Sequence, residues 1–95
     1  MIFRIASLTV SDADLPGLVE TYAQRCSPLI RAEPGNLDRY LLTPFEPGGQ
    51  VLACTVWDTD SAAERYDVSG RGVAIAQALA PMLGSPPVLR SYRRR

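Results

Sequence analysis

The segment VWDTDSAAERYDVSG, residues 56–70, gathers the side chains of this sequence that are best suited to chemistry on a small aromatic molecule. Trp57 could stack on a planar ring, although a tryptophan here could equally close the end of a hydrophobic core. Tyr66 shares a helical face with Ala62 and Ala63, whose small side chains would leave space in front of its ring. Its hydroxyl could donate to a phenolic substrate, or it could be a satisfied core tyrosine. Tyr66 and Trp57 are the candidate catalytic residues.

Proton transfer has to rely on a carboxylate or a phenol, because the chain contains no histidine. Asp67 and Asp58 are the carboxylates closest to the tryptophan and tyrosine. Asp67 directly follows Tyr66 rather than lying one helical turn away, so we expect it to face solvent. Asp58 is placed to cap the helix that follows. Either is a hypothetical general base.

Three further residues are candidates for binding a substrate. Tyr22 lies on the apolar stripe of the first predicted helix and has the same two interpretations as Tyr66. Arg4 interrupts an apolar strand, and a buried guanidinium must find a carboxylate or an anionic ligand; an ion pair at a dimer interface would satisfy it. Gln77 is the only polar residue in the middle of the last helix, where it could bind a substrate carbonyl or face solvent.

Composition excludes several classes of function. Ten basic and ten acidic residues cancel among 95, so no net field favours binding to nucleic acid. The opening segment, residues 1–10, is too short for a membrane span and is interrupted by Arg4, so we expect a cytoplasmic protein. Cys26 and Cys54 fall on separate predicted elements, as two buried thiols in a reducing compartment would. With no histidine and no ligand spacing, we expect neither a metal site nor a cofactor.

Hydrophobic periodicity and capping residues divide the chain into four strands and three helical segments, of which the last two follow one another directly. Ser61 and Glu64 have the spacing of a capping box, which predicts that Ser61 opens the second helix, and Pro28 predicts a kink or an early end in the first. Strands are predicted over residues 1–10, 36–45, 51–58 and 88–94, a first helix from Leu15 to about 31, a second from Ser61, and a further helix over 71–83.

The order strand, helix, strand, strand, helix, strand predicts an α+β fold of the ferredoxin-like split βαβ type, as one domain over residues 1–95. It has a four-stranded antiparallel sheet with its helices on one face. The first strand is apolar on both sides, with Phe3 and Ile5 opposite Ile2 and Leu8. We therefore expect the bare sheet face to pack against a second copy, which makes the protein a homodimer.

The sequence resembles a known family through three stretches: "P..R.EPG.L.RYLL.P" from Pro28 to Pro44, "VL...VWD...AAERY..SG" from Val51, and a closing "LGSPPVL.SY". These are similar to the antibiotic biosynthesis monooxygenase family of small dimeric α/β-barrel proteins. The resemblance covers nearly the whole chain and implies that fold. The superfamily includes cofactor-free oxygenases of aromatic polyketides, quinol monooxygenases, haem-degrading enzymes and polyketide cyclases, so it implies a range of reactions.

Departures from the family pattern narrow the expected function. Haem-degrading relatives have a histidine after the tryptophan, whereas this chain contains no histidine. They also have an asparagine in the first strand, where this chain has Ala6. Anthrone-oxidising relatives carry asparagine, tyrosine and arginine where this chain has Ala53, Ala63 and Gln77, and only Trp57 is kept. The resulting hypothesis is a cofactor-independent monooxygenase that oxidises a planar polyphenolic, anthrone- or hydroquinone-like molecule with O₂. The alternatives are a polyketide cyclase or isomerase, and a non-catalytic ligand-binding or dimerisation module.

Overall fold

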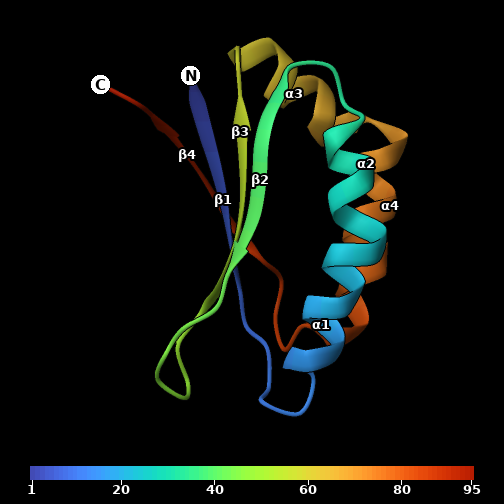
Figure 1. Ribbon diagram of the computed structural model, residues 1–95, viewed down its shortest axis with the longest axis vertical. Helices are drawn as coiled ribbons and strands as arrows, with labels where there is room; N and C mark the ends of the chain where they lie inside the picture. The colour runs from blue at the N-terminus through green and yellow to red at the C-terminus, as the bar shows by residue number, and fades with distance from the viewer.

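The computed structural model describes residues 1–95 and has the predicted order of strands and helices, with each main helix divided into shorter pieces (Figure 1). The predicted α+β fold of the ferredoxin-like type is confirmed. The elements are β1 (Ile2–Leu8), α1 (Leu15–Thr21), the π-helical turn η1 (Tyr22–Cys26), α2 (Ser27–Arg31), β2 (Asn36–Leu42), β3 (Val51–Trp57), α3 (Asp60–Val68), α4 (Gly70–Leu79), the 3-10 turn η2 (Ala80–Met82) and β4 (Val88–Arg93).

The four strands form one antiparallel sheet in the order β2-β3-β1-β4. All helices lie on one face of it, as predicted, and the other face is bare (Figure 1). Side chains of a strand alternate between the two faces, so each strand contributes one row to the helix-covered interior and one to the bare side. On the bare side lie Phe3, Ile5 and Tyr40, together with the buried Cys54 and Val56. The predicted apolar character of both sheet faces is confirmed.

The first helical region runs without a break from Leu15 to Arg31, but five of its residues form a π-helical turn. Leu18, Tyr22, Cys26 and Ile30 recur every four residues and are all buried against the sheet. The turn ends just before Pro28, which cannot donate to the carbonyl four residues earlier. The wider π-helical turn accommodates the missing hydrogen bond. In place of the predicted kink or early end at Pro28, the structure has a π-helical turn within a continuous helix.

The N-cap of the second helix lies two residues earlier than the capping box indicates. Thr59 is its N-cap: its backbone is extended, and its hydroxyl accepts from the Ala62 backbone N–H at 3.1 Å. The expectations that Ser61 opens the helix and that Asp58 caps it are therefore wrong. Thr59 occupies the N-cap position, from which its hydroxyl reaches the free backbone N–H three residues later. Ser69 both ends α3 and begins α4, because its hydroxyl donates to the Tyr66 carbonyl and accepts from the Gly72 N–H.

Both cysteines are free and buried, Cys26 under the helices and Cys54 on the bare sheet face. Burial raises the pKa of each thiol, and Arg25 lowers that of Cys26 only in part. The thiols therefore stay protonated near neutral pH. None of the helices has both the length and the apolar composition needed to cross a membrane.

Candidate active site

A row of polar side chains crosses the helix-facing side of the sheet at the level of Thr55. Thr55 is paired with Arg4 on β1 and with Arg39 on β2, and Arg4 is paired with Ser91 on β4. Partners on adjacent antiparallel strands point to the same side, so these side chains all enter the layer between sheet and helices. The next row along the strands, at Ala53, is apolar. Two cations thus stand in an interior that is otherwise hydrophobic.

Arg4 meets a carboxylate from α3. Its Nη2 donates to both oxygens of Asp67, at 2.9 and 3.1 Å, and its side chain is only 13% exposed. The arginine therefore does find an ion pair, but within the chain rather than at a dimer interface. Asp67, expected to face solvent, is 40% exposed and turns back toward the sheet. The Nε of Arg4 is buried and has no partner, so one of its donors remains free.

Trp57 forms a wall behind the candidate site. It is completely buried, and its Nε1 donates to the Thr55 hydroxyl at 2.7 Å. Its ring contacts Tyr66, with centroids 5.0 Å apart and planes tilted by 33°. A ring that is enclosed on all sides cannot stack on a substrate in this arrangement. The structure assigns Trp57 the position of a packing partner for Tyr66.

Tyr66 contacts Trp57 and directly precedes Asp67, the partner of Arg4, on α3. It is partly buried, its hydroxyl makes no hydrogen bond within the chain, and this oxygen is not among the buried unpartnered atoms. It is therefore accessible to a ligand. Burial raises the pKa of Tyr66 to about 12, with smaller contributions from Cys26, Asp67 and Glu33, while Arg4 acts in the opposite direction. The phenol is consequently protonated at neutral pH and acts as a hydrogen-bond donor. It does not readily ionise to the phenolate that could act as a base.

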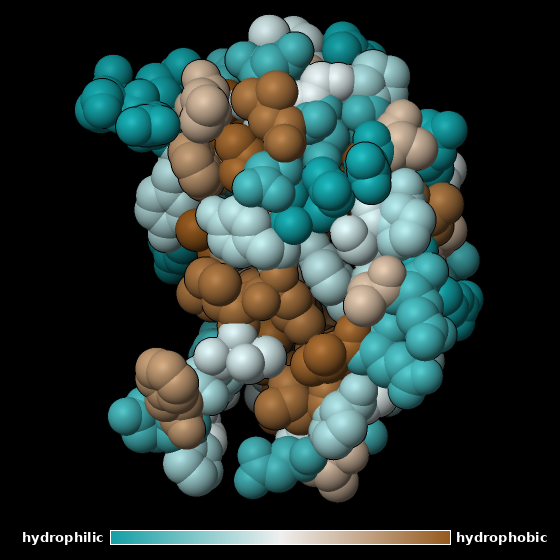
Figure 2. All heavy atoms as spheres, viewed as in Figure 1, coloured by the Kyte–Doolittle hydropathy of each residue, from teal (hydrophilic) through white to brown (hydrophobic).

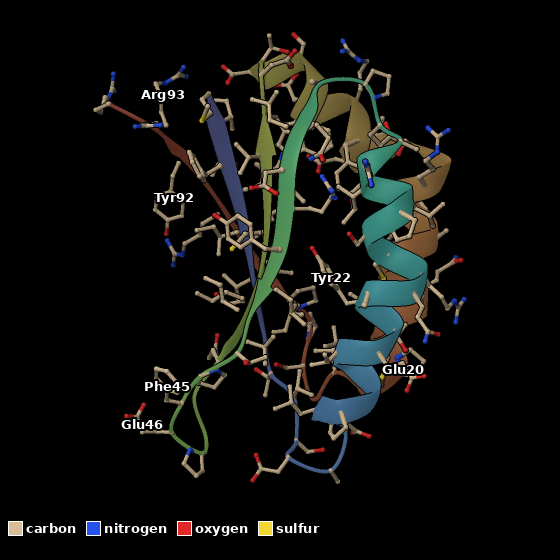
Figure 3. The ribbon with its side chains drawn as sticks, viewed as in Figure 1. Glu20, Tyr22, Phe45, Glu46, Tyr92 and Arg93 are labelled. Carbon is tan, nitrogen blue, oxygen red and sulfur yellow. The ribbon has the colours of Figure 1, made fainter.

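Tyr22 reaches into the same layer from the helical side. Figure 3 shows its side chain crossing from the helix toward β2. Tyr22 is 7% exposed and its hydroxyl is buried without a partner. Burial, with help from Cys26 and Tyr66, raises the pKa of Tyr22, and the Arg39 guanidinium lowers it in part. The Nε of Arg39 is also buried and unpartnered.

Two open hollows give access to this layer. The larger, of about 440 Å³, lies between α3 and the β1–β4 side of the sheet; Arg4 and Ala63 are among its lining residues. Its other lining residues are Ile2, Asp60, Glu64, Ser91, Tyr92 and Arg93. The Arg93 guanidinium is 3.4 Å from the Asp60 carboxylate across this opening. A groove of this size admits a small aromatic molecule.

The smaller hollow, of about 240 Å³, lies at the opposite end of the helix-facing side, between the β2–β3 hairpin and the start of α1. Its apolar lining includes Val10, Leu15 and Val51. Figure 2 shows apolar side chains gathered above an indentation in this part of the molecule. Phe45, at the hairpin tip, is fully exposed beside it (Figure 3).

Two sequence candidates stay outside the site. Gln77 is exposed on α4, whose buried face is formed by Ile75 and Leu79. Because α4 is apolar around much of its circumference, the sequence did not show that Gln77 points away from the sheet. Asp58 is exposed, and its backbone N–H donates to the Gly35 carbonyl at 3.0 Å. Neither Gln77 nor Asp58 is placed to contact a molecule between sheet and helices.

Arg39 and Thr55 are site residues that the sequence candidates omit. Arg39 carried a usable signal, since it alternates with Leu41 on the interior side of its strand, as Arg4 does on β1. Thr55 carried none, because a threonine in a strand is ordinary. Nowhere do three or more cysteine, aspartate or glutamate side chains come close enough together to hold a metal ion.

Comparison with known proteins identifies relatives of this fold. Residues 1–71 match the family described as "Antibiotic biosynthesis monooxygenase". No curated protein matches the chain.

Several solved structures are similar over nearly the whole chain. A mutant of SnoaB, a cofactor-independent oxygenase from Streptomyces nogalater, has a TM-score of 0.81 at 20% identity, covering 99% of this chain and 92% of its own. MhuD, solved with two manganese protoporphyrin IX molecules per active site, has a TM-score of 0.82 at 20% identity, with 99% and 94% covered. Rv0793 from Mycobacterium tuberculosis has a TM-score of 0.74 at 16% identity, with 99% and 94% covered. At these identities the likeness establishes the shared fold.

Proposed function

The chain belongs to the antibiotic biosynthesis monooxygenase family, and on that basis we propose that it oxidises a planar polyphenolic molecule with O₂, without a cofactor. The substrate is anthrone- or hydroquinone-like and binds in the groove between α3 and the β1–β4 side of the sheet. Polyketide-derived secondary metabolites are the natural source of such molecules. The observation that carries the proposal is Arg4, a cation at the wall of this groove with a free buried donor.

A cation in this position supports oxidation that starts from a substrate anion. An anthrone-type substrate first loses a proton from its CH₂ group and becomes a delocalised anion. This anion gives one electron to O₂, and the resulting radical and superoxide form a C–O bond. The peroxide takes up a proton and loses water, which leaves a new carbonyl. One oxygen atom enters the product, the other leaves as water, and the substrate supplies every electron.

Arg4 and Tyr66 stabilise the anion in this scheme. Arg4 holds the substrate oxygen on which negative charge develops, and the accessible Tyr66 hydroxyl donates a second hydrogen bond to it. Donors fixed in a partly dry site act more strongly than the same donors in water. Trp57 contributes indirectly, because it packs against the Tyr66 ring and holds that hydroxyl at the groove.

Asp67 receives the proton. It is the carboxylate in contact with Arg4, and it is exposed enough to pass a proton on to solvent. A carboxylate is a weak base, which suits a substrate that is acidic in its own right. This requirement favours anthrones and hydroquinones over unactivated aromatic rings.

The bare sheet face supports a second part of the proposal. We propose that it packs against the same face of a second copy, so that the working protein is a cytoplasmic homodimer. Leu42, Val88 and Tyr92 are each about half exposed there, beside the partly buried Phe3 and Ile5. An apolar sheet face of this kind requires cover, and an isologous dimer is the simplest way to supply it.

A non-catalytic binding module is the second candidate. The burial of Trp57 favours it, since the one indole of the chain is then a packing residue and provides no stacking surface. A cyclase or isomerase would use the same groove for proton transfer and would consume no O₂.

Oxygen uptake by the purified protein, against a panel of anthrones and hydroquinones, tests the proposal. Uptake should match formation of the quinone product one to one. Tyr66→Phe and Asp67→Asn should each reduce turnover by more than about tenfold, the usual size of an acid-base contribution. Glu20→Gln, exposed on α1, is the control for the carboxylate substitution.

The alternatives predict different results. Binding of the same compounds with no oxygen uptake would reject the monooxygenase and favour the binding module. Conversion that continues under anaerobic conditions would identify a cyclase or isomerase. Turnover that Tyr66→Phe and Asp67→Asn leave unchanged would reject the assigned residues.

A further inference from the structure

The bare face of the sheet carries one aspartate and one arginine on an otherwise uncharged surface. The strand register places Asp38 of β2 level with Val56, and Arg90 of β4 level with Ile5, so both side chains stand on the side away from the helices (Figure 1). The other paired residues that point to this side are uncharged and mostly apolar. The larger ones include Phe3, Ile5, Tyr40, Leu42, Val88 and Tyr92.

Neither charge has a counter-ion within the chain. The three salt bridges of the protein join other residues, and the Asp38 carboxylate accepts only from the Arg39 backbone N–H, at 2.8 Å. Asp38 and Arg90 are both exposed, and they stand on the two edge strands of the sheet. Three strand spacings, about 14 Å, separate those edges. The aspartate and the arginine of one chain are therefore too far apart to pair with each other.

A dimer that joins two bare faces can arrange these charges in two ways. If the two-fold axis runs along the strands, β2 lies over the partner's β4, and Asp38 faces the partner's Arg90 at both edges. If the axis runs across the strands, each strand lies over its own counterpart, which brings Asp38 toward the partner's Asp38 and Arg90 toward the partner's Arg90. The first arrangement joins opposite charges and the second joins like charges. Charge complementarity therefore selects the axis along the strands.

The dimensions of packed sheets allow this contact. Asp38 is level with Val56 and Arg90 is level with Cys54, two residues away on β3, which is an offset of about 7 Å along the strands. Sheets that pack face to face lie about 10 Å apart. The Cα atoms of the two residues are then about 12 Å apart, and an extended arginine together with an aspartate bridges that gap.

We propose that the homodimer forms with β2 of each copy over β4 of the other, and that Asp38 pairs with the partner's Arg90 at both edges of the interface. This inference rests on the homodimer proposed above and adds which strands meet and which residues fix their orientation. The apolar centre of the face supplies affinity, whereas the two ion pairs at its rim disfavour the crosswise arrangement.

Charge reversal tests the ion pairs, with the dissociation constant of the dimer measured by sedimentation equilibrium of the full chain at low salt. Asp38→Arg and Arg90→Asp each replace two attractive contacts by two repulsive ones, so each should raise that constant roughly tenfold or more. The combined variant Asp38→Arg/Arg90→Asp has opposite charges again, in exchanged positions. Its dissociation constant should return to within about threefold of the wild-type value.

A mixing experiment tests whether the contact lies between copies. Asp38→Arg is positive at both positions and Arg90→Asp is negative at both, so each should self-associate poorly. In an equimolar mixture every contact joins opposite charges, and the two variants should combine about as tightly as the wild type does with itself. Native mass spectrometry, with one variant isotopically labelled, measures the ratio of heterodimer to homodimer.

Further variants separate the orientation of the dimer from other effects of charge. Asp38→Asn keeps the side-chain oxygen that accepts from the Arg39 N–H and removes the charge. It should weaken the dimer by roughly three- to tenfold, because two rim ion pairs are lost. The crosswise arrangement predicts tighter association instead, since repulsion between like charges is relieved. Glu20→Arg/Arg65→Asp exchanges the same charges at exposed positions of α1 and α3 and should leave the dissociation constant unchanged.

Several results would overturn the proposed contact. They are unchanged dissociation constants for both single reversals, a combined variant as weak as the single ones, and tighter association of Asp38→Asn. Each of these would leave the homodimer itself standing. A wild-type chain that stays monomeric at all concentrations would reject the homodimer as well. Oxygen uptake by the wild type is measured separately, so none of these outcomes decides whether the protein is an oxygenase.

Discussion

Replacing Thr55 by valine should show whether Trp57 is a structural residue, as its burial indicates. The substitution keeps the shape of the side chain and removes the acceptor of the Trp57 Nε1 hydrogen bond, 2.7 Å long in the native protein. Trp57 is 0% exposed and Thr55 is 9% exposed, so water cannot take over the lost bond. An unsatisfied buried donor costs about 2 kcal/mol, which lowers Tm by roughly 8–16 °C in a domain of this size.

A double-mutant cycle with Trp57→Phe isolates this hydrogen bond. Phenylalanine keeps an aromatic ring against Tyr66 but has no N–H, so adding Thr55→Val to it should cost little more. We expect a coupling free energy of about 1–2 kcal/mol, measured by guanidinium unfolding at one fixed protein concentration. Thr43→Val, at an exposed threonine after β2, is the control and should change stability by less than about 0.5 kcal/mol. A coupling below about 0.5 kcal/mol would refute the argument that the enclosed indole is held by Thr55.

Three further predictions concern stability. Thr59→Ala should lower the free energy of unfolding by about 1 kcal/mol and Ser61→Ala by almost nothing, because Thr59 is the observed cap; equal effects in thermal unfolding would contradict this. Gly35→Ala should lower the free energy of unfolding by about 3 kcal/mol or more, since φ is +86° and the new Cβ would lie 2.6 Å from both the Ala62 Cβ and the Asp58 Oδ1. Gly48→Ala, with φ of +81° in open space, should lower it by only about 1 kcal/mol. A smaller loss at Gly35 than at Gly48 would be inconsistent with the packing. Stability should fall as pH rises from about 10 toward 12, because unfolded Tyr66 loses its proton near its ordinary pKa of 10.0 while the folded pKa is about 12. Tyr66→Phe should make guanidinium midpoints fall less steeply over this range, with the remaining slope due to Tyr22, whose pKa burial also raises; an unchanged slope would rule out a contribution from Tyr66.

The strands could be predicted from sequence because their alternation is local. Arg39 and Leu41 on one side of β2, and Phe3 and Ile5 on one side of β1, have the period that a half-buried strand imposes. The helix start was harder, since Asp58 and Ser61 stand on either side of the observed cap and each satisfies the local rules. Only the folded backbone decides that Thr59 reaches a free N–H.

The site was less predictable, because its contacts join distant parts of the chain. Arg4 and Asp67 are 63 residues apart, and nothing in the local pattern of either identifies the other as its partner. Gln77 was misplaced because a helix that is apolar nearly all round gives no orientation. Tyr22 and Tyr66, by contrast, lie on the apolar stripes that predicted their interior position, because periodicity records which side of a helix is buried.

Two alanines of β3 and α3 bear on the proposed site. Ala53 and Ala63 stand where the anthrone-oxidising relatives are expected to carry polar side chains, and both face the interior. With alanine at these positions, β3 and α3 provide no polar side chain there that could hold an anion. Arg4 and Arg39 supply positive charge to this layer from the two strands on either side of β3. A site built from strand residues has less conformational freedom than one built from loops, so its two cations stay apart. Arg4 is paired with Asp67, whereas Arg39 makes no salt bridge within the chain, so the two cations of this layer differ in their surroundings.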